Sequence, residues 1–532
     1  MDEDKKSFAD RICETETGDD LQIIKKFLKS KALYLAAALL FQLLILIILM
    51  SYFSYEFLPI YYLMIVLSVV VSVIVINRDS DTSSKILWVF VIMALPFFGG
   101  MLYLLFGGRK IPKALMIQDR QAYSDYKQYA LQNMRMIENG PSDDPNFKKM
   151  VSMAWNNGYF PVYANAKTRY YSTGMKQYEA ILEALKSAEE YIFIETYILD
   201  EGQMWDSILE ILLEKVRNGV DVRMIYDDFG SILNIKPEYR DWLADQGIQV
   251  HAFNPIHPQL AIQMNNRDHR KIIVVDGKIV FTGGSNIADE YINAVERFGY
   301  WKDMGMRIEG RAVEPFVISF LQTWNYSSDT NTPYEEFVAP VSVFDNFKGE
   351  RGYVIPFSDS PTDSNNIGKN IHMNMLSGST DYCWISTPYL ILDAETESQL
   401  ILAVNNGVDV RIVVPGIPDK KMVYEVTKSN YQHLLEKGVR IFEYTPGFIH
   451  GKVTLADDRQ AFVGTVNMDF RSYYLNYECG IWMYDTESIP SIREDFEEIF
   501  ENSHEVTLKE VENTNFWVRW TRNVLRIFSP LM

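Results

Sequence analysis

The chain has 532 residues, which is too long for one ordinary hydrophobic core and indicates two to four structural units. Hydrophobic residues make up 48% of the chain and aromatic residues 14%, and this composition excludes a disordered protein. The net charge of −19 argues against nucleic acid as a partner, because nucleic-acid-binding proteins usually carry a basic surface. The cysteines, Cys13, Cys383 and Cys479, lie far apart and form no CxxC pair, which is typical of a reducing compartment.

Two long apolar segments follow a short N-terminal segment, residues 1–30. The first, residues 32–50, is interrupted only by one tyrosine and one glutamine, and the second, residues 57–76, has no charged residue. As helices, both segments are long enough to cross a hydrocarbon layer of about 30 Å. We therefore predict a transmembrane hairpin with helices at about 32–53 and 57–76. A pair of buried core helices is the alternative, but uncharged pairs of this length are rare in protein cores.

The basic residues around this hairpin set its predicted orientation. Four lysines lie within residues 25–31, and Arg78 and Lys85 follow the second helix, whereas the connecting loop, residues 51–56, carries no basic residue. The positive-inside rule then places both flanks, including residues 1–30, in the cytoplasm. The bulk of the chain follows the hairpin and is expected to face the cytoplasm as well.

A third apolar segment, residues 86–107, contains one proline and a Gly-Gly pair and is followed by Arg109 and Lys110. A full crossing here would place the rest of the chain on the other side of the membrane. Basic residues on both sides argue against a crossing, and we expect a kinked segment that is interfacial or re-entrant. The predicted membrane region thus covers residues 31–114.

Beyond residue 115 the sequence repeats itself. The hexapeptide Asn-Gly-Val-Asp-Val-Arg occurs at residues 218–223 and again at residues 406–411. Each copy follows a strand-like run and a helical stretch, and it precedes a second strand-like run. This order predicts a duplicated α/β domain with mainly parallel strands and helices on both faces. We expect a first domain at 115–340 and a second at 341–532, packed about a pseudo-twofold axis with a site at their seam.

A second repeated pattern, which we call the cassette, carries the candidate chemistry. Both copies read HxKxxxxD, with an Asn seventeen positions after the His. The whole chain has only seven His, so it is improbable that two of these histidines occupy matching positions of a repeat by chance. The first cassette comprises His269, Lys271, Asp276 and Asn286, and the second comprises His450, Lys452, Asp457 and Asn467.

The cassettes suit a phosphodiester substrate. If each forms a strand, the His and the Lys point to the same face and aim an imidazole and an ammonium group at one ligand. The Asp lies seven positions after the His and points the other way, so within the catalytic set we assign Asp276 and Asp457 a structural role. After a turn, Asn286 and Asn467 return towards the lysines and add amide donors around the phosphate oxygens.

The two histidines are expected to divide the roles in the reaction. One attacks phosphorus and forms a phosphohistidine, while the other protonates the leaving alcohol and then deprotonates the incoming one. A carboxylate on the far ring nitrogen fixes the tautomer of a reactive His. Glu478 is the candidate for His450. In the first half, Asp303 is preferred to Glu296. No HxH, HExxH or CxxC arrangement occurs, and the lysines repel a cation, so we expect no metal.

The C-terminal segment mixes aromatic and basic residues. Arg519, Arg522 and Arg526 are interleaved with aromatic and aliphatic side chains, and no acidic residue follows Glu512. Such a segment suits a membrane surface. A terminal helix docked on the fold explains the pattern equally well.

These motifs resemble the phospholipase D superfamily, whose members carry two such cassettes. The match narrows to bacterial-type cardiolipin synthases and covers nearly the whole chain from about residue 30. Besides the cassettes and the two N-terminal apolar segments, the resemblance rests on residues 281–286, 289–291, 301–303, 463–465, 467–469, 471–472, 476–478 and 529–531.

The resemblance implies condensation of two phosphatidylglycerol molecules into cardiolipin and glycerol at a bacterial cell membrane. It implies phosphatidylglycerol and membrane lipids as partners, without a metal or nucleotide cofactor, and it favours His269 as the nucleophile. Lys302 stands where Arg is expected, and Met304 also departs from the family pattern. These departures bear on lipid preference and not on the chemistry.

Several alternatives remain open. A hydrolase of the same chemistry forms phosphatidic acid, and a related transferase uses another donor or acceptor, such as phosphatidylethanolamine. A catalytically silent membrane scaffold is disfavoured by the two intact cassettes. A nuclease is disfavoured by the membrane segments and by the net charge of −19.

Overall fold

The computed structural model describes residues 58–78, 81–95, 98–107, 144–255, 266–339, 349–362 and 365–531, and, singly, residues 41, 44, 45, 48, 127 and 347. The segment 1–30 and, apart from four single helical positions, the predicted first membrane helix at 32–53 therefore lie outside the described residues.

Three apolar helices begin the described chain: α3 (Leu58–Ile76), α4 (Thr82–Ala94) and α5 (Phe98–Phe106). α3 spans nearly the same residues as the second predicted membrane helix. The segment predicted at 86–107 comprises two helices, and α4 begins after Asp81, whose carboxylate accepts a hydrogen bond from the Ser84 N–H. In this part of the chain and in the other described residues, no helix combines the length and apolarity of a membrane span.

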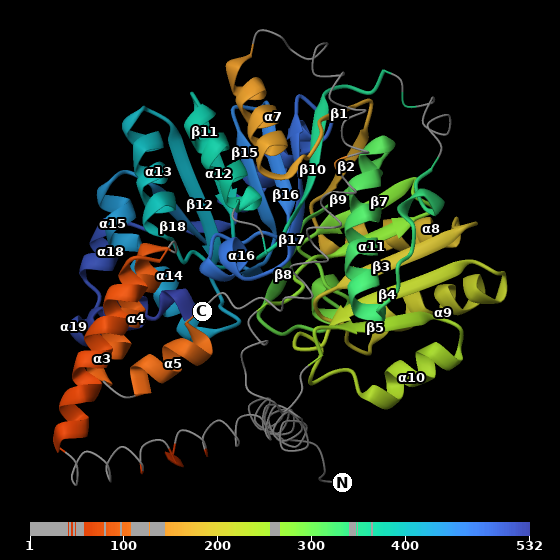
Figure 1. Ribbon diagram of the computed structural model, residues 1–532. Helices are drawn as coiled ribbons and strands as arrows, with labels where there is room; N and C mark the ends of the chain where they lie inside the picture. Colours follow the sequence, from red (N-terminus) through yellow and green to blue (C-terminus); the bar gives the residue numbers. More distant parts are fainter. Residues whose placement is uncertain are drawn as a thin grey trace, which may run out of the picture.

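The first half of the globular part is built on a seven-stranded sheet of order β2-β9-β7-β6-β3-β4-β5 (Figure 1). Side chains alternate along β3, so Ile192 and Ile194 pack under α8 and α9, whereas Phe193 packs under α11 on the opposite face. The strands are β2 (Lys167–Tyr171), β3 (Tyr191–Thr196), β4 (Asp221–Asp227), β5 (Gln249–Phe253), β6 (Ile272–Val275), β7 (Ile279–Gly283) and β9 (Gly305–Glu309). The helices are α8 (Gly174–Lys186), α9 (Gln203–Arg217), α10 (Pro237–Asp245) and α11 (Glu314–Ser328), with 3-10 turns η3 (Asp289–Ile292), η4 (Arg311–Val313) and η5 (Tyr334–Glu336).

The second half repeats this plan on a nine-stranded sheet of order β1-β10-β17-β16-β15-β11-β12-β13-β18. Its strands are β1 (Tyr163–Ala164), β10 (Tyr353–Asp359), β11 (Tyr382–Ser386), β12 (Asp409–Pro415), β13 (Arg440–Tyr444), β15 (Lys452–Ala456), β16 (Gln460–Gly464), β17 (Glu478–Tyr484) and β18 (Ser503–Glu505). Its helices are α7 (Pro145–Gly158), α12 (Ile367–Gly378), α13 (Ala394–Asn405), α14 (Lys421–Ser429), α15 (Tyr431–Glu436), α16 (Phe470–Tyr474), α17 (Ile489–Glu501), α18 (Leu508–Glu512), α19 (Phe516–Ile527) and the 3-10 turn η7 (Ser529–Leu531). The early elements α7 and β1 pack with this half, because β1 pairs with β10.

The duplication is confirmed, but the expectation of mainly parallel strands is wrong. Among the described strands of each sheet, only two neighbouring pairs are parallel: β3–β4 and β4–β5 in the first, and β11–β12 and β12–β13 in the second. The cassette strands form hairpins, β6–β7 and β15–β16, that reverse at Asp276 and Asp457. A short turn of this kind can join only antiparallel strands.

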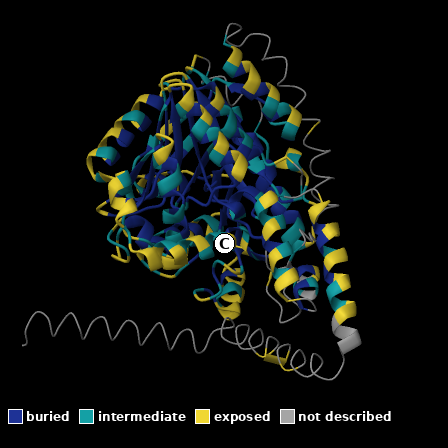
Figure 2. Ribbon diagram, turned by 90° about the vertical axis from the view of Figure 1, so that its left-hand side faces the viewer, coloured by how far each residue is buried: buried dark blue, intermediate teal, exposed yellow. Residues whose placement is uncertain are grey.

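One hydrophobic core joins the two halves. It contains Phe193 and Phe320 from the first half together with Val453, Ile481 and Phe496 from the second. The buried residues gather in the strands, and the exposed ones lie on the outer helices (Figure 2). At the edge of this core, β8 (Tyr300–Lys302) pairs with β14 (Gly447–Ile449), and a single bridge joins Asp268 to Tyr477. These two contacts, which we call the seam, bring the cassettes of both halves together.

Candidate active site

Each cassette histidine lies just before a strand, at the seam. β6 and β15 begin only after the histidines. The His269 N–H donates to the Tyr477 carbonyl at 2.9 Å, and the His450 N–H donates to the Lys302 carbonyl at 2.8 Å. Each cassette was expected to form a strand, and a strand forms in each, but the histidine lies outside it because its main chain pairs with the opposite half and not with its own sheet.

Each histidine ring is held by a carboxylate of the opposite half. The Nδ1 of His269 lies 2.9 Å from Oε2 of Glu478, and the Nδ1 of His450 lies 2.8 Å from Oδ2 of Asp303. Both predicted carboxylates are thus at the site, but the expected pairing within one half is wrong. Each carboxylate directly follows the residue whose carbonyl binds the histidine main chain. The main-chain pairing at the seam therefore brings each histidine to the carboxylate of the opposite half, which we call the exchange of partners.

Further hydrogen bonds fix both carboxylates, which are fully buried. The hydroxyl of Thr465 donates to Glu478 at 2.5 Å. The Met304 N–H and the indole N–H of Trp301 donate to Asp303 at 2.9 and 3.4 Å. The role of these donors follows from the folded seam, because no local sequence pattern shows that they face the two carboxylates.

Burial and charge set the protonation of these pairs. Burial disfavours the imidazolium and lowers the pKa of His269 to about 4 and that of His450 to about 3. Burial alone would raise the pKa of Glu478, but the neighbouring His269 and Lys271 lower it overall. A neutral imidazole therefore donates its Nδ1–H to an ionised carboxylate. The lone pair of Nε2 remains available on each ring.

The two cassette lysines complete one electrostatic cluster. Lys271 Nζ donates to the His269 carbonyl at 2.6 Å, and Lys452 Nζ donates to the His450 carbonyl at 2.5 Å. Both lysines are close enough to both histidines to lower the histidine pKa values. Burial lowers the pKa of Lys271 to about 8 and that of Lys452 to about 7, and the charge of Lys271 contributes to the shift of Lys452.

These lysines predict an alkaline limit to activity. As pH rises through about 7 to 8, the pair loses the positive charge that attracts a phosphate, so kcat/KM of the free enzyme should fall across this range. The measurement is kcat/KM between pH 5 and pH 10. Lys452→Arg keeps the positive charge to higher pH. If this variant retains turnover, the fall of its kcat/KM should move to higher pH. A wild-type profile that stays flat from pH 7 to pH 9 contradicts this role of the lysines.

The two asparagines behave differently. Asn286 and Lys271 line the same small cavity, but the Asn286 amide is already engaged: it accepts from the Ile198 N–H at 3.0 Å and donates to the Tyr291 hydroxyl at 2.6 Å. The buried Oδ1 of Asn467 has no hydrogen-bond partner among the described residues. The Asn286 amide nitrogen carries a second N–H besides the one that supports Tyr291, and its contact with the substrate phosphate stays a prediction.

Aromatic rings surround both histidines. The Tyr197 ring centroid lies 5.3 Å from that of His269. The rings of Tyr291, Trp301 and Phe448 lie 5.6, 5.4 and 5.7 Å from that of His450. These rings limit the access of water and restrict rotation of the imidazoles. The sequence alone does not distinguish Tyr197 or Phe448 as site residues, because aromatic residues are common throughout this chain.

The two cassette aspartates lie at the far ends of their strands. Asp276 accepts hydrogen bonds from the N–H groups of Glu189, Glu190 and Tyr191, and so fixes the start of β3. Asp457 accepts from the N–H groups of residues 380–382 in the same way, at the start of β11. The hydrogen bonds found for these carboxylates do not involve the cassette histidines or lysines.

Asp276→Asn is expected to lower stability more than turnover. The amide keeps one acceptor oxygen but loses the charge that binds three N–H groups, a change that costs about 1–3 kcal/mol of unfolding free energy. Denaturant unfolding and kcat, measured on the same preparation, test this. A stably folded variant with a large loss of kcat would show that Asp276 takes part in the chemistry.

The surroundings of the two histidines are not symmetric. Asp268 and Arg270 flank His269, and the guanidinium of Arg270 binds Asp268 at 3.0 Å and Glu195 at 2.9 Å. Burial raises the pKa of the Glu195 carboxyl well above its usual range. The residues that flank His450 are Ile449 and Gly451, which carry no charge. The neighbourhood of His269 therefore holds an additional buried ionic network.

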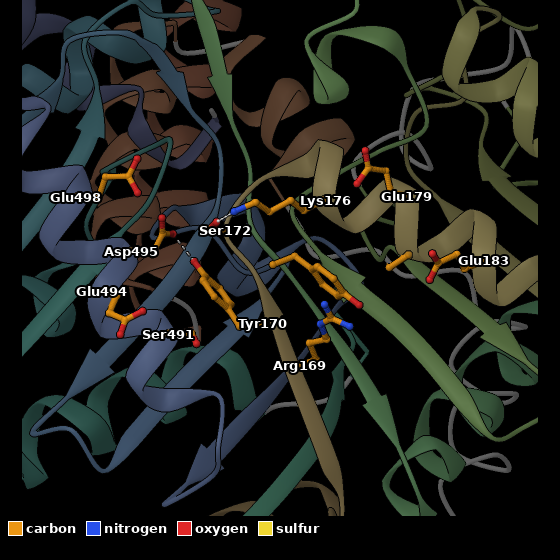
Figure 3. Close-up of a pocket in the computed structure, with 12 residues that line it drawn as sticks. Arg169, Tyr170, Ser172, Lys176, Glu179, Glu183, Ser491, Glu494, Asp495 and Glu498 are labelled. Carbon is orange, nitrogen blue, oxygen red and sulfur yellow. Dashed lines mark hydrogen bonds between the residues drawn. The ribbon is translucent and has the colours of Figure 1, made fainter.

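The residue before Asp303 is anchored from the second half. The Lys302 ammonium donates to Asp495 in α17 at 2.5 Å, and the Tyr170 hydroxyl donates to the same carboxylate at 2.6 Å. These groups lie beside a cavity of about 540 Å³ between the two halves, where Figure 3 shows Tyr170 pointing at Asp495. No cassette residue lines this cavity. Lys302 is thus bound through its side chain to α17 and through its carbonyl to His450.

In the described part of the chain, no group of three or more His, Cys, Asp or Glu side chains is placed to hold a metal ion. The site instead presents two imidazoles and two ammonium groups. This donor set suits an anionic phosphodiester, which needs positive charge around its oxygens and a nucleophile at phosphorus.

Comparison with known proteins identifies the family. The family described as "Cardiolipin synthase, PLD-like domain" matches residues 181–297 and 373–500, which contain the two cassettes, and "Phospholipase_D-nuclease N-terminal" matches residues 66–108. An uncharacterized protein of Streptococcus mutans is 40% identical over 464 residues, 86% of this chain and 98% of that protein. A cardiolipin synthase of Alkalihalophilus pseudofirmus is 32% identical over 87% of this chain and 92% of its own length.

The fold has a solved relative. The crystal structure of a phosphatidylserine synthase from Haemophilus influenzae superposes with a TM-score of 0.56 at 17% identity, and covers 72% of this chain and 97% of that one. At this identity the likeness concerns the duplicated fold alone. The family match and the sequence relatives show that this chain belongs to the cardiolipin synthase family of proteins with phospholipase D-like domains.

Proposed function

We propose that this protein is a cardiolipin synthase that moves a phosphatidyl group from one phosphatidylglycerol to a second, giving cardiolipin and glycerol. The observation that carries the proposal is the exchange of partners at the seam, where each histidine is bound to a carboxylate of the opposite half. Because neither half holds a complete His–carboxylate pair, the reactive centre needs both halves. The sequence relatives named cardiolipin synthase support the same reaction.

In the first step, Nε2 of His269 attacks the phosphorus of the first phosphatidylglycerol. A P–N bond forms as the bond to the glycerol oxygen breaks, and His450 gives that oxygen the proton with which glycerol leaves. Glu478 accepts from Nδ1–H and stabilises the positive charge that develops on the His269 ring. The bound phosphodiester anion favours the protonated form of His450 that this step requires.

In the second step, His450 accepts the proton of the headgroup hydroxyl of the second phosphatidylglycerol. The oxygen attacks phosphorus, the P–N bond breaks, and cardiolipin leaves with His269 regenerated. The His269 and His450 side chains are only 11% and 8% exposed, and this limited access of water favours transfer over hydrolysis. Lys271 and Lys452 hold the phosphate oxygens throughout, with Asn286 and Asn467 in supporting positions. Neither step requires a metal or a nucleotide.

We also propose that the N-terminal region is a membrane hairpin, with helices at about 32–53 and 57–76 and residues 86–107 interfacial or re-entrant. Support comes from α3, where Val66 and Val73 are 59% and 52% exposed on a helix without charged residues. Such a surface is unfavourable in water and favourable in a bilayer. The proposed organisation in a bacterial membrane has a cytoplasmic segment, residues 1–30, and a membrane region, residues 31–114. The catalytic domains that follow, residues 115–340 and 341–532, face the cytoplasm.

A product assay tests the proposed reaction. The protein, purified in detergent, is given phosphatidylglycerol as the only lipid, with a chelator and no nucleotide. Cardiolipin and glycerol in equal amounts are expected. Phosphatidic acid as the sole product would show a hydrolase, and cardiolipin formed only after a second lipid class is added would show a different acceptor or donor.

A further inference from the structure

The last helix, α19, docks on the second half through its polar side. The Arg522 guanidinium donates to Glu425 of α14 at 2.7 Å, and that of Arg526 donates to Glu397 of α13 at 3.0 Å. Leu525 packs beside Val426 between these ion pairs. At about 100° per residue, the three docking residues of α19 lie within a sector of about 100° of the helix.

The opposite side of α19 is apolar and open. Phe516, Trp517 and Trp520 are 62%, 69% and 54% exposed, and Ile527 on the same side is 39% exposed. No residue of α19 is buried. An ordinary amphipathic helix of a globular protein packs its apolar side on the core and turns its charged side to water. α19 does the reverse, so its aromatic side is available to another apolar phase.

This open side lies at the same end of the molecule as the apolar N-terminal helices. The 3-10 turn η7, which directly follows α19, packs against α4, and α4 packs against α3. Figure 1 shows α3, α4, α5 and α19 together at one end of the second half. A bilayer entered by α3 therefore lies close to α19.

We propose that the aromatic side of α19 binds the anionic phospholipid surface of that same bilayer. The inference rests on the membrane hairpin proposed above. Trp and Phe are favoured at the membrane interface, where a large ring is partly dehydrated. From residue 513 to the end, the chain carries three Arg and no Lys, Asp or Glu, although its net charge is −19. Arg522 and Arg526 are paired with Glu425 and Glu397, so Arg519, next to the aromatic side, supplies the positive charge that matches anionic headgroups. Binding through the aromatic side gives the docked second half a second contact with the membrane.

Two labelled positions on α19 provide the test and its control. Trp520→Cys places an environment-sensitive NBD dye on the aromatic side, and Val518→Cys places it on the opposite side, where Val518 is 39% exposed. Cys13 is replaced by Ser, and Cys383 and Cys479 are buried. The full chain is reconstituted in vesicles of phosphatidylcholine and phosphatidylserine, with or without lipids that carry a quenching doxyl group. A third label at Val70 of α3, 49% exposed, reports on the hairpin.

The expected result is a blue shift, about twofold stronger emission and quenching by doxyl lipid at position 520, without these changes at position 518. Phosphatidylcholine alone should weaken the effect. Quenching at position 70 but not at position 520 overturns the α19 proposal and leaves the hairpin standing. No quenching at either position overturns the hairpin as well. A blue shift at 520 without lipid quenching, together with crosslinking between copies, overturns the proposal in favour of a protein interface. Equal quenching at 518 and 520 overturns the proposed orientation.

Discussion

Replacing either cassette histidine with alanine is expected to abolish phosphatidyl transfer. His450→Ala removes the group that moves the proton to and from the alcohols, which lowers kcat by about 10²–10⁴-fold. His269→Ala removes the proposed nucleophile, so no covalent intermediate forms and the loss is larger. The measurement is the initial rate of cardiolipin formation from phosphatidylglycerol at equal concentrations of folded protein.

A third histidine provides the matched control. His504 is exposed on β18 and binds Glu510 outside the seam, so His504→Ala should leave the rate unchanged. Each variant is checked for a native unfolding transition, because both site histidines are buried. A rate within about tenfold of wild type in folded His269→Ala or folded His450→Ala would rule out the two-histidine mechanism.

Neutralising the carboxylates is expected to lower turnover by about 10²–10⁴-fold each, because the histidines then hold the wrong tautomer. In Glu478→Gln, an amide N–H turned toward Nδ1 of His269 moves the ring proton to Nε2, where the attacking lone pair is needed. Asp303→Asn does the same to His450. The volume of each side chain is nearly kept, so folding is expected to survive.

The exchange of partners makes this prediction specific. With histidine-selective ¹⁵N labelling, Glu478→Gln should shift the ring resonances of His269, and Asp303→Asn should shift those of His450. Resonances are assigned from the two His→Ala variants. A shift of His450 in the Glu478→Gln spectrum, with His269 unchanged, would contradict the pairing across the seam.

The sequence predicted the cassettes and the duplication because both are local patterns. A motif of eight residues needs no knowledge of the fold, and repeated hexapeptides reveal a repeated unit. The positions of Glu478 and Asp303 after the cassettes predicted that both carboxylates lie at the site. These positions did not predict that Glu478 pairs with His269. That pairing depends on the bridge between Asp268 and Tyr477, two residues far apart in the chain, and no local pattern encodes such a contact.

The prediction of mainly parallel strands was wrong for a related reason. Strand–helix–strand order predicts parallel neighbours, and this holds for β3, β4 and β5. It does not apply to β6 and β7, which are joined by a turn at Asp276 and Gly277 and must run antiparallel. In the same way, the direction of Asn286 was set by Tyr291 and the Ile198 N–H, partners that only the folded chain brings together.

The proposed mechanism requires a covalent phosphatidyl group on one of the two histidines of the shared site. It is tested by mixing the enzyme with phosphatidylglycerol labelled in its acyl chains, stopping the reaction in alkaline detergent, and locating the label by mass spectrometry. We predict a phosphatidyl group on His269 that is absent from His269→Ala and is discharged to cardiolipin by further phosphatidylglycerol. Label on His450 would reverse the two roles. An enzyme that forms cardiolipin but carries no label on either histidine would rule out the phosphohistidine intermediate.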